Sequence, residues 1–395
     1  MDEQSLLDKI AKDPNNETTY LVYADWLEEQ GQNDRAELIR LELEAENLPN
    51  WSPKREKLQN RRSELLDHLR ANWNVLRQVP GDITVNWLRG LPTQIQFLWS
   101  SAHQVSTETF QYVLQFPFLQ SLVTSGHFPP EWLESLSESA NLHTLHITNR
   151  TKDHVQPLLS LPHLQNLTIS GYFESFIPQL VQFPRLKSLA LYGQIENETC
   201  LHIGQLQSLR SLRLCTNAKA PEDGLAHLVS LTKLEELYLP DFGMTSEGCE
   251  HIGQLVNLKK LELIENEIKD EGVKYLVPLQ QLQVLDLTET DISNKSYPYL
   301  AKLKKLKGLD LRYNFSLDGK GLSKLKDLPE LEELDISWSE VRLDDLVSLL
   351  EFPNLKFVRT SSDMFSEDEE DDYEEVERWE TAFQKEDILM DVHWE

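Results

Sequence analysis

The sequence lacks the features that mark most enzymes, metalloproteins and disulfide-bonded proteins. Its only cysteines, Cys200, Cys215 and Cys249, form no CxxC pair and no Cys/His cluster, which argues against a disulfide framework or a zinc site of the usual spacing. The GxxxxGKS/T, GxGxxG, HExxH and GxSxG motifs and the EF-hand loop are absent, so the common phosphate-binding, hydrolytic and metal-binding signatures are missing. We therefore expect no catalytic residue, no cofactor and no metal site, and a protein that is not an enzyme.

Basic residues and long apolar runs are also scarce. Only 38 Lys and Arg oppose 66 Asp and Glu, a net charge of −28, and such a surface repels phosphate backbones and anionic lipids. No stretch approaches the roughly 18 apolar residues of a membrane span, and the opening residues MDEQSLLDKI do not resemble a secretory signal. We expect a cytoplasmic protein that binds neither nucleic acid nor membranes.

What the sequence does contain is a repeat, LxxLxL or a close variant, over more than half of its length. Successive copies begin 22 to 25 residues apart, within the roughly 20 to 29 residues of leucine-rich repeats. Degenerate copies before and after extend the array, and residues 81–97 are expected to form its capping hairpin or first coil. We predict about 11 to 12 coils over residues 80–360. The nine regular copies begin at Leu142, Leu164, Leu186, Leu209, Leu234, Leu258, Leu282, Leu306 and Leu331.

The copy over residues 258–281 shows how one coil folds. Its three repeat leucines alternate on a short strand and point inward, and Asn266 follows at the turn, where its amide can bond backbone groups of adjacent coils. Asn217 and Asn314 occupy the same position elsewhere, and Thr290 or Ser339 supplies a weaker version of the same bond. Apolar residues then recur at helical spacing. On this helix Cys200 and Cys249 take apolar positions, so we expect both thiols to be buried.

The periodicity predicts an α/β solenoid with parallel strands on the concave face and short helices on the convex face. The same residues resemble the leucine-rich-repeat family, especially its bacterial 24-residue forms with Glu-Gly before the helix, as at Glu271-Gly272. The resemblance implies a right-handed coil with a concave ligand face, and that the ligand is a protein.

Residues 1–79 show helical periodicity instead, and we predict a small helical domain with a charged connecting helix. The segment from Leu21 to Leu27 (LVYADWL), Gly31 and the Ala36–Arg40 run resemble the short repeat-companion domain that planctomycete bacteria place before repeat arrays. Four aromatic and charged residues of this segment could form a binding cluster or belong to a packed core, and the core is favoured. In the core, Asp25 either orients backbone amides or pairs with Arg35 or Arg40. The four residues are Tyr23, Asp25, Trp26 and Arg40.

Strand alternation also predicts which side chains line the concave face. The residue between the second and third repeat leucines must point outward, and four consecutive coils place a carboxylate there, on strands about 5 Å apart. Two interpretations stay open: an acidic strip that binds a basic partner, framed by aromatic side chains, or a solvated acidic face balanced by local bases. The predicted partner-binding residues are Tyr238, Glu262, Asp286, Asp310, Arg312, Tyr313, Asp335 and Trp338.

Residues 361–395 form an acidic tail with fifteen acids and two bases, a net charge of −13 that leaves −15 on the rest. Val376, Trp379 and Phe383 nevertheless recur at helical spacing, so the tail is either a C-terminal cap on the last coil or a linear motif for a partner.

The function predicted from these features is a protein–protein interaction scaffold that binds a partner on the concave face of an acidic solenoid. We expect the partner to have a basic surface and the scaffold to be a monomer. The first alternative is an acidic inhibitor or regulator of a basic enzyme. A less favoured alternative is an enzyme, or enzyme subunit, that uses the N-terminal helical module.

Overall fold

The computed structural model describes residues 2–393 with the exception of short segments. Those segments are 14–15, 47, 49–52, 73–82, 89–90, 98–105, 115–118, 128–129, 137–138, 140, 150–155, 162, 217–221, 362–368 and 387. The chain divides into two compact units, residues 1–170 and 171–395. The predicted boundary at residues 79–80 lies outside the described residues and stays a prediction, as do the other domain limits.

The first unit begins with four helices. Asp2 and Asn16 cap the first two, because each side chain accepts a hydrogen bond from a backbone N–H of the first turn. Their apolar faces bury Tyr23 and Leu27 in a common core, and Asp25 forms an ion pair with Arg40 at 2.7 Å, one of the two pairings expected. The helices are α1 (Glu3–Lys12), α2 (Glu17–Glu29), α3 (Asn33–Glu46) and α4 (Pro53–Asn72).

Strands follow the helices in the same unit. The first two form an antiparallel hairpin, and the second of them pairs with the next in parallel. Phe110 stacks on Trp132 with ring centroids 4.2 Å apart and closes the apolar layer between strands and helices. The elements are β1 (Ile83–Leu88), β2 (Leu91–Phe97), α7 (Thr107–Leu114), β3 (Ser121–His127), α8 (Pro130–Ser135), β4 (Thr144–Asn149), η2 (Gln156–Ser160) and β5 (Asn166–Gly171).

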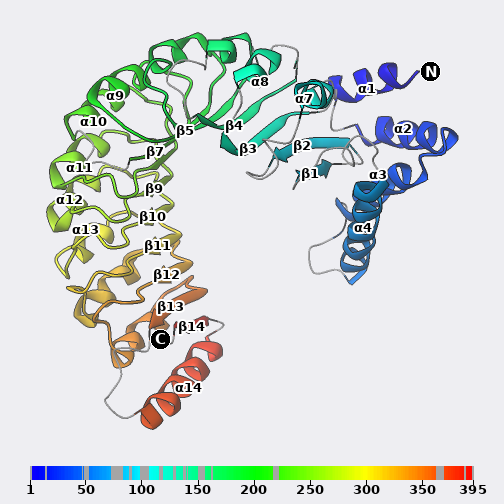
Figure 1. Ribbon diagram of the computed structural model, residues 1–395. Coiled ribbons are helices and arrows are strands. Elements are labelled where there is room, and N and C mark those ends of the chain that lie inside the picture. Colours follow the sequence, from blue (N-terminus) through cyan, green and yellow to red (C-terminus); the bar gives the residue numbers. More distant parts are fainter. Residues whose placement is uncertain are drawn as a thin grey trace. The chain divides into compact units, whose positions relative to one another are not determined.

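The second unit repeats one pattern, a strand followed by a short helix. Figure 1 shows strands along the inner side of this unit and helices along its outer side. Its elements are η3 (Ile177–Gln182), β6 (Ser188–Tyr192), α9 (Asn197–Ile203), β7 (Ser211–Cys215), η4 (Glu222–Gly224), α10 (Leu225–Leu228), β8 (Glu236–Tyr238), α11 (Ser246–Ile252), β9 (Lys260–Glu262), α12 (Lys269–Leu276), β10 (Val284–Asp286), α13 (Tyr297–Leu300), β11 (Gly308–Asp310), η5 (Gly319–Asp327), β12 (Glu333–Asp335), η6 (Leu343–Glu351), β13 (Phe357–Ser361), α14 (Glu369–Lys385) and β14 (Leu389–His393).

The predicted α/β solenoid of parallel strands is confirmed. From β6 to β14 each strand pairs in parallel with the next, and the repeat leucines align, as Leu261 does with Leu285 and Leu285 with Leu309. These leucines are buried, since a coil can cover its apolar stripe only with its neighbours. Cys200 and Cys249 are buried as expected, and burial raises the pKa of the Cys200 thiol to about 12.

The turn asparagines bond adjacent coils as predicted. The Asn314 amide donates to the carbonyls of Leu287, Leu311 and Arg312 at 2.8 to 3.1 Å and accepts from backbone amides of the preceding coil. Two coils earlier, the Asn266 amide likewise donates to three carbonyls and accepts from one backbone N–H, that of Met244. By contrast, the Ser339 hydroxyl donates one bond, to the Ile336 carbonyl. Asn217 lies outside the described residues.

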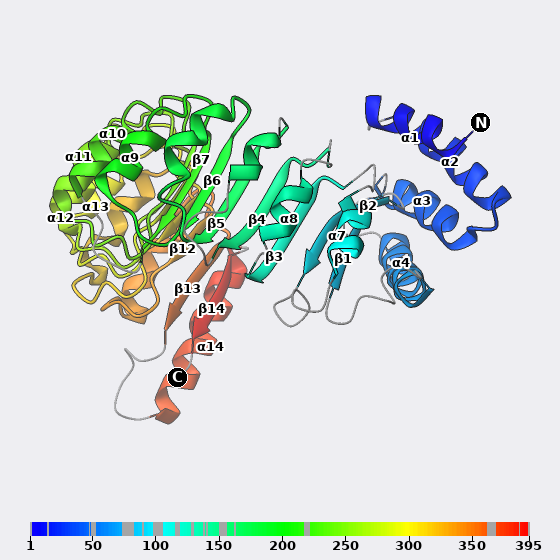
Figure 2. The same ribbon diagram turned by 45° about the horizontal axis from the view of Figure 1, so that its top comes forward.

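The C-terminal segment adds a last strand to the sheet of the second unit. In Figure 2 β14 lies beside β13, and the two pair in parallel, with Val358 opposite Met390. Val376, Trp379 and Phe383 of α14 are buried, and α14 packs on β14 and η6. Whether this segment acts as the cap that a solenoid end requires stays a prediction. No helix among the described residues is long and apolar enough to cross a membrane.

Candidate functional site

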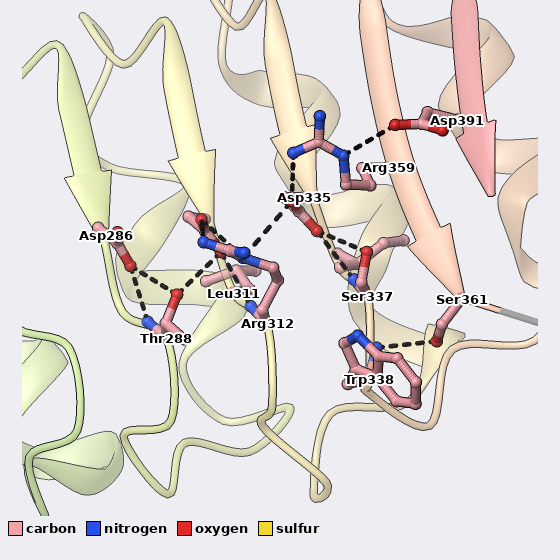
Figure 3. Close-up of polar contacts among 12 residues, drawn as sticks. Asp286, Thr288, Leu311, Arg312, Asp335, Ser337, Trp338, Arg359, Ser361 and Asp391 are labelled. Carbon is pink, nitrogen blue, oxygen red and sulfur yellow. Dashed lines mark hydrogen bonds and ion pairs between the residues drawn. The ribbon is translucent and has the colours of Figure 1, made fainter. Parts of the chain in front are cut away.

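The predicted carboxylates do lie in one row on the strand face of the second unit. The strand register places Glu262 beside Asp286, Asp286 beside Asp310, and Asp310 beside Asp335. Each stands at the end of its three-residue strand, so short strands and constant register bring four acids together. Figure 3 shows Asp286 and Asp335 of this row.

Each aspartate of the row also closes the turn that follows its strand. The Oδ1 atom of Asp286 accepts from the Thr288 backbone N–H at 3.0 Å and from its hydroxyl at 2.7 Å. Asp335 receives the same two bonds from Ser337. One oxygen of each carboxylate is therefore committed to the fold. The Asp-x-Thr/Ser spacing in the sequence could have indicated this role.

Arginines compensate the later half of the row. The Arg312 guanidinium lies 2.8 Å from Asp310 and 3.5 Å from Asp335. Arg359, one strand further, bridges Asp335 and Asp391 of β14 at 3.2 and 3.1 Å. The acidic strip expected from alternation is therefore a ladder of alternating charges over β11 to β14, because long guanidinium side chains reach across neighbouring coils.

The earlier end of the row is compensated as well. Glu262 lies 2.9 Å from Arg213 and 3.1 Å from Lys260. Tyr238 stands between these two bases, with the Arg213 guanidinium 4.2 Å from its ring centroid. Burial, followed by the hydrogen bond to Glu236, raises the pKa of Tyr238 to about 12. Tyr238 and Glu262 are thus engaged with residues of this chain.

Asp286 differs from its neighbours, because none of the ion pairs within the described part of the chain includes it. The Thr288 hydroxyl lies 2.7 Å from Asp286 and 3.0 Å from Asp310, so its one hydrogen is shared by two carboxylates. Burial, and then the charge of Asp310, raise the pKa of Asp286. A cation placed here would offset the repulsion between Asp286 and Asp310.

Tyr313 and Trp338 stand at the turns beyond the row. Their rings stack in parallel with centroids 5.7 Å apart, and Phe315, 63% exposed, meets Tyr313 edge-on. Tyr313 itself is 38% exposed. Aromatic surface of this size that remains open to solvent is typical of contact sites rather than of cores.

Both residues belong to a series that we call the left-handed row. In each of five consecutive coils the residue at one turn position has φ between 45° and 59° although it is not glycine, a conformation that costs about 1–2 kcal/mol per residue. Lys269 and Asp291, at a later position in two of these coils, have it as well. Bonds between coils hold the turn residue there, as where the Glu289 N–H donates to the Arg312 carbonyl at 2.9 Å. The three acids of this row are exposed and carry no ion pair among the described residues. The row is Asp241, Glu265, Glu289, Tyr313 and Trp338.

The repeat spacing, the parallel register and the leucine-lined interior together decide the fold. This is a leucine-rich-repeat solenoid. No family model matches the sequence, and no curated protein matches it. The resemblance of the first residues to the repeat-companion domain, and with it a bacterial origin, therefore stays a prediction.

Solved structures of leucine-rich-repeat proteins are similar to this chain. An internalin from Listeria monocytogenes is 19% identical, with a TM-score of 0.45, over 68% of this chain and 80% of that one. A leucine-rich-repeat protein from Leptospira interrogans is 16% identical, with a TM-score of 0.36, over 76% and 90%. TLR13, in a complex with an ssRNA, is 22% identical, with a TM-score of 0.44, over 63% and 40%.

Proposed function

We propose that this solenoid is a protein-interaction scaffold whose partner places a basic side chain at Asp286 and an apolar side chain on the Tyr313–Trp338 stack. The proposal is carried by the stacked rings of Tyr313, which is exposed, and Trp338, which is partly exposed, on the coils that follow Asp286. None of the ion pairs among the described residues includes Asp286. Tyrosine and tryptophan dominate the binding energy of protein interfaces. A lysine or arginine beside them would contribute both an ion pair and a cation–π contact.

The contacts within the chain reduce the predicted contact residues to a smaller set. Arg312 pairs with both Asp310 and Asp335. Glu262 pairs with Arg213 and Lys260. Breaking such pairs to bind a partner would leave a partly buried charge uncompensated, which is costly. We therefore assign the direct contacts to the residues whose charge or ring is available. These are Asp286, Glu289, Tyr313, Phe315 and Trp338.

The net charge of −28 also supports a basic partner, because it would attract a cationic surface toward the solenoid and speed association. An acidic regulator of a basic enzyme is a special case of this proposal and would use the same surface. A catalytic role for the N-terminal helices has less support, because the Tyr23 hydroxyl and Arg40 are engaged with Glu3, Arg35, Asp25 and Glu28. Cytoplasmic location and a monomeric state stay predictions.

Selection from a library of displayed random 12-residue peptides tests this function. We expect the full chain to enrich peptides in which Lys or Arg stands within two or three residues of an aromatic or aliphatic side chain. Enrichment should be lost with the Tyr313→Ala/Trp338→Ala variant. It should persist with Tyr275→Ala, which removes a similarly exposed ring from α12. Enrichment without basic residues, or unchanged by the double substitution, would contradict the proposal.

A further inference from the structure

A second open surface lies in the first unit, at the N-terminal ends of β2 to β5. It is a groove of about 580 Å³, within the range of roughly 300–1,000 Å³ that is usual for ligand sites. Apart from the His143 imidazole, no lining side chain is ionisable. The groove is lined by Thr93, Gln94, Gln120, Ser121, His143, Thr144, Gln165 and Asn166.

The lining follows from the repeat. Each coil contributes two residues at equivalent register positions: β3, β4 and β5 contribute the residue just before the strand and the first residue of the strand, and β2 contributes Thr93 and Gln94 from within the strand. The backbone N–H groups are already used between coils, since Gln120 donates to Thr93, His143 to Gln120 and Gln165 to His143 at 2.8 to 2.9 Å. A ligand would therefore meet side-chain amides and hydroxyls, which both donate and accept hydrogen bonds. Some of this capacity is used within the chain, since Asn166 donates to the Thr144 hydroxyl at 2.9 Å and Gln94 accepts from Asn86 at 2.9 Å.

The same repeat position is filled differently in the second unit. There the residues before β7, β8 and β9 are Arg210, Glu235 and Lys259, and Glu235 pairs with both bases; Gln283, before β10, is a neutral exception. Further along, Lys356 pairs with Glu332 at 2.6 Å. Charged side chains thus satisfy one another at this position in the second unit, whereas in the first unit the position holds neutral polar groups around a groove.

We propose that this groove binds a neutral oligosaccharide, a ligand distinct from the protein partner of the second unit. Sugar hydroxyls match amide and hydroxyl side chains in being both donors and acceptors, and an uncharged ligand needs no counter-charge. An extended peptide fits less well. Its side chains repeat on one face every ~6.7 Å, whereas the coils that supply the lining repeat every ~4.8 Å, so a peptide lying across the strands would lose register. The lining also includes His143, whose ring lies 6.2 Å from the His163 ring between centroids.

The probes are cellohexaose, maltohexaose and chitohexaose, titrated into the full chain and followed by calorimetry. We expect at least one to bind, and the Gln120→Ala/Gln165→Ala variant to weaken that binding by at least tenfold. Gln283→Ala is the matched control, because Gln283 holds the same repeat position in the second unit. It should leave the affinity unchanged.

Three results would overturn the assignment. These are no binding of any of the three oligosaccharides at millimolar concentration, equal binding by the double variant, and binding of a neutral Gln/Ser peptide in preference to the sugars. Thermal unfolding of each variant shows whether the fold is intact, and Gln120→Ser with Gln165→Ser provides a second, milder variant if the alanine variant is unstable.

Discussion

Replacing Asn314 with alanine is expected to lower the free energy of unfolding by about 3–5 kcal/mol. The amide is 1% exposed, donates to three backbone carbonyls and accepts from the N–H groups of Thr290 and Ile292. Each buried backbone group left without a partner costs roughly 1–3 kcal/mol, and some are rescued by water. Because stability in a solenoid is a sum over neighbouring coils, the loss should appear as an early unfolding step of this region.

Asn257→Ala is the control for this experiment, since its exposed amide makes a single bond to the Thr232 carbonyl at 2.8 Å. That substitution should cost less than about 1 kcal/mol. Urea unfolding followed by circular dichroism compares the two variants. Equal stability of the two would show that the buried asparagines do not hold the coils together.

Removing the aromatic pair is expected to have the largest effect on binding. The Tyr313→Ala/Trp338→Ala variant should bind a selected basic peptide more weakly by about 2–4 kcal/mol, or roughly 30- to 1,000-fold. Alanine has a Cβ atom, as tyrosine and tryptophan do, so the substitutions leave the backbone strain at φ of 56° and 59° unchanged. Because Tyr313 is exposed and Trp338 is partly exposed, stability should change far less than affinity.

Tyr313→Phe separates the ring from its hydroxyl. We expect it to bind nearly as well as the native chain, because the stack with Trp338 is kept. Fluorescence anisotropy of a labelled peptide measures all three affinities. If the affinity falls in step with the melting temperature of the variants and not with the loss of the rings, the role of the pair is structural.

Much of the fold can be predicted from the sequence because spacing and burial act together. Leucines 22 to 25 residues apart can be buried only if each coil stacks on the next, so the parallel register follows from the repeat itself. The row from Glu262 to Asp335 follows in turn from strand alternation.

Other features depend on three-dimensional reach and could not be predicted in this way. Arg359 compensates Asp335 from another coil, and its second partner, Asp391, comes from a strand 32 residues later. The left-handed turn at Tyr313 has no glycine to signal it and is held by a bond to the next coil. By contrast, the Asp-x-Thr/Ser spacing is present in the sequence at Asp286 and Asp335 and indicates the turn bonds that their carboxylates accept.

The most direct test of the account compares Asp286→Asn with the native chain for both stability and peptide binding. Burial and Asp310 raise the pKa of Asp286 above its ordinary value, so its charge destabilises the fold above that raised pKa, and the penalty vanishes below the ordinary value. Asparagine keeps the acceptor for Thr288 and should stabilise the protein by about 0.2–1 kcal/mol at pH 7, with no gain near pH 3. We predict that the same variant binds the basic peptide more weakly. Higher stability with unchanged affinity would contradict the account, because the carboxylate of Asp286 would then serve no partner.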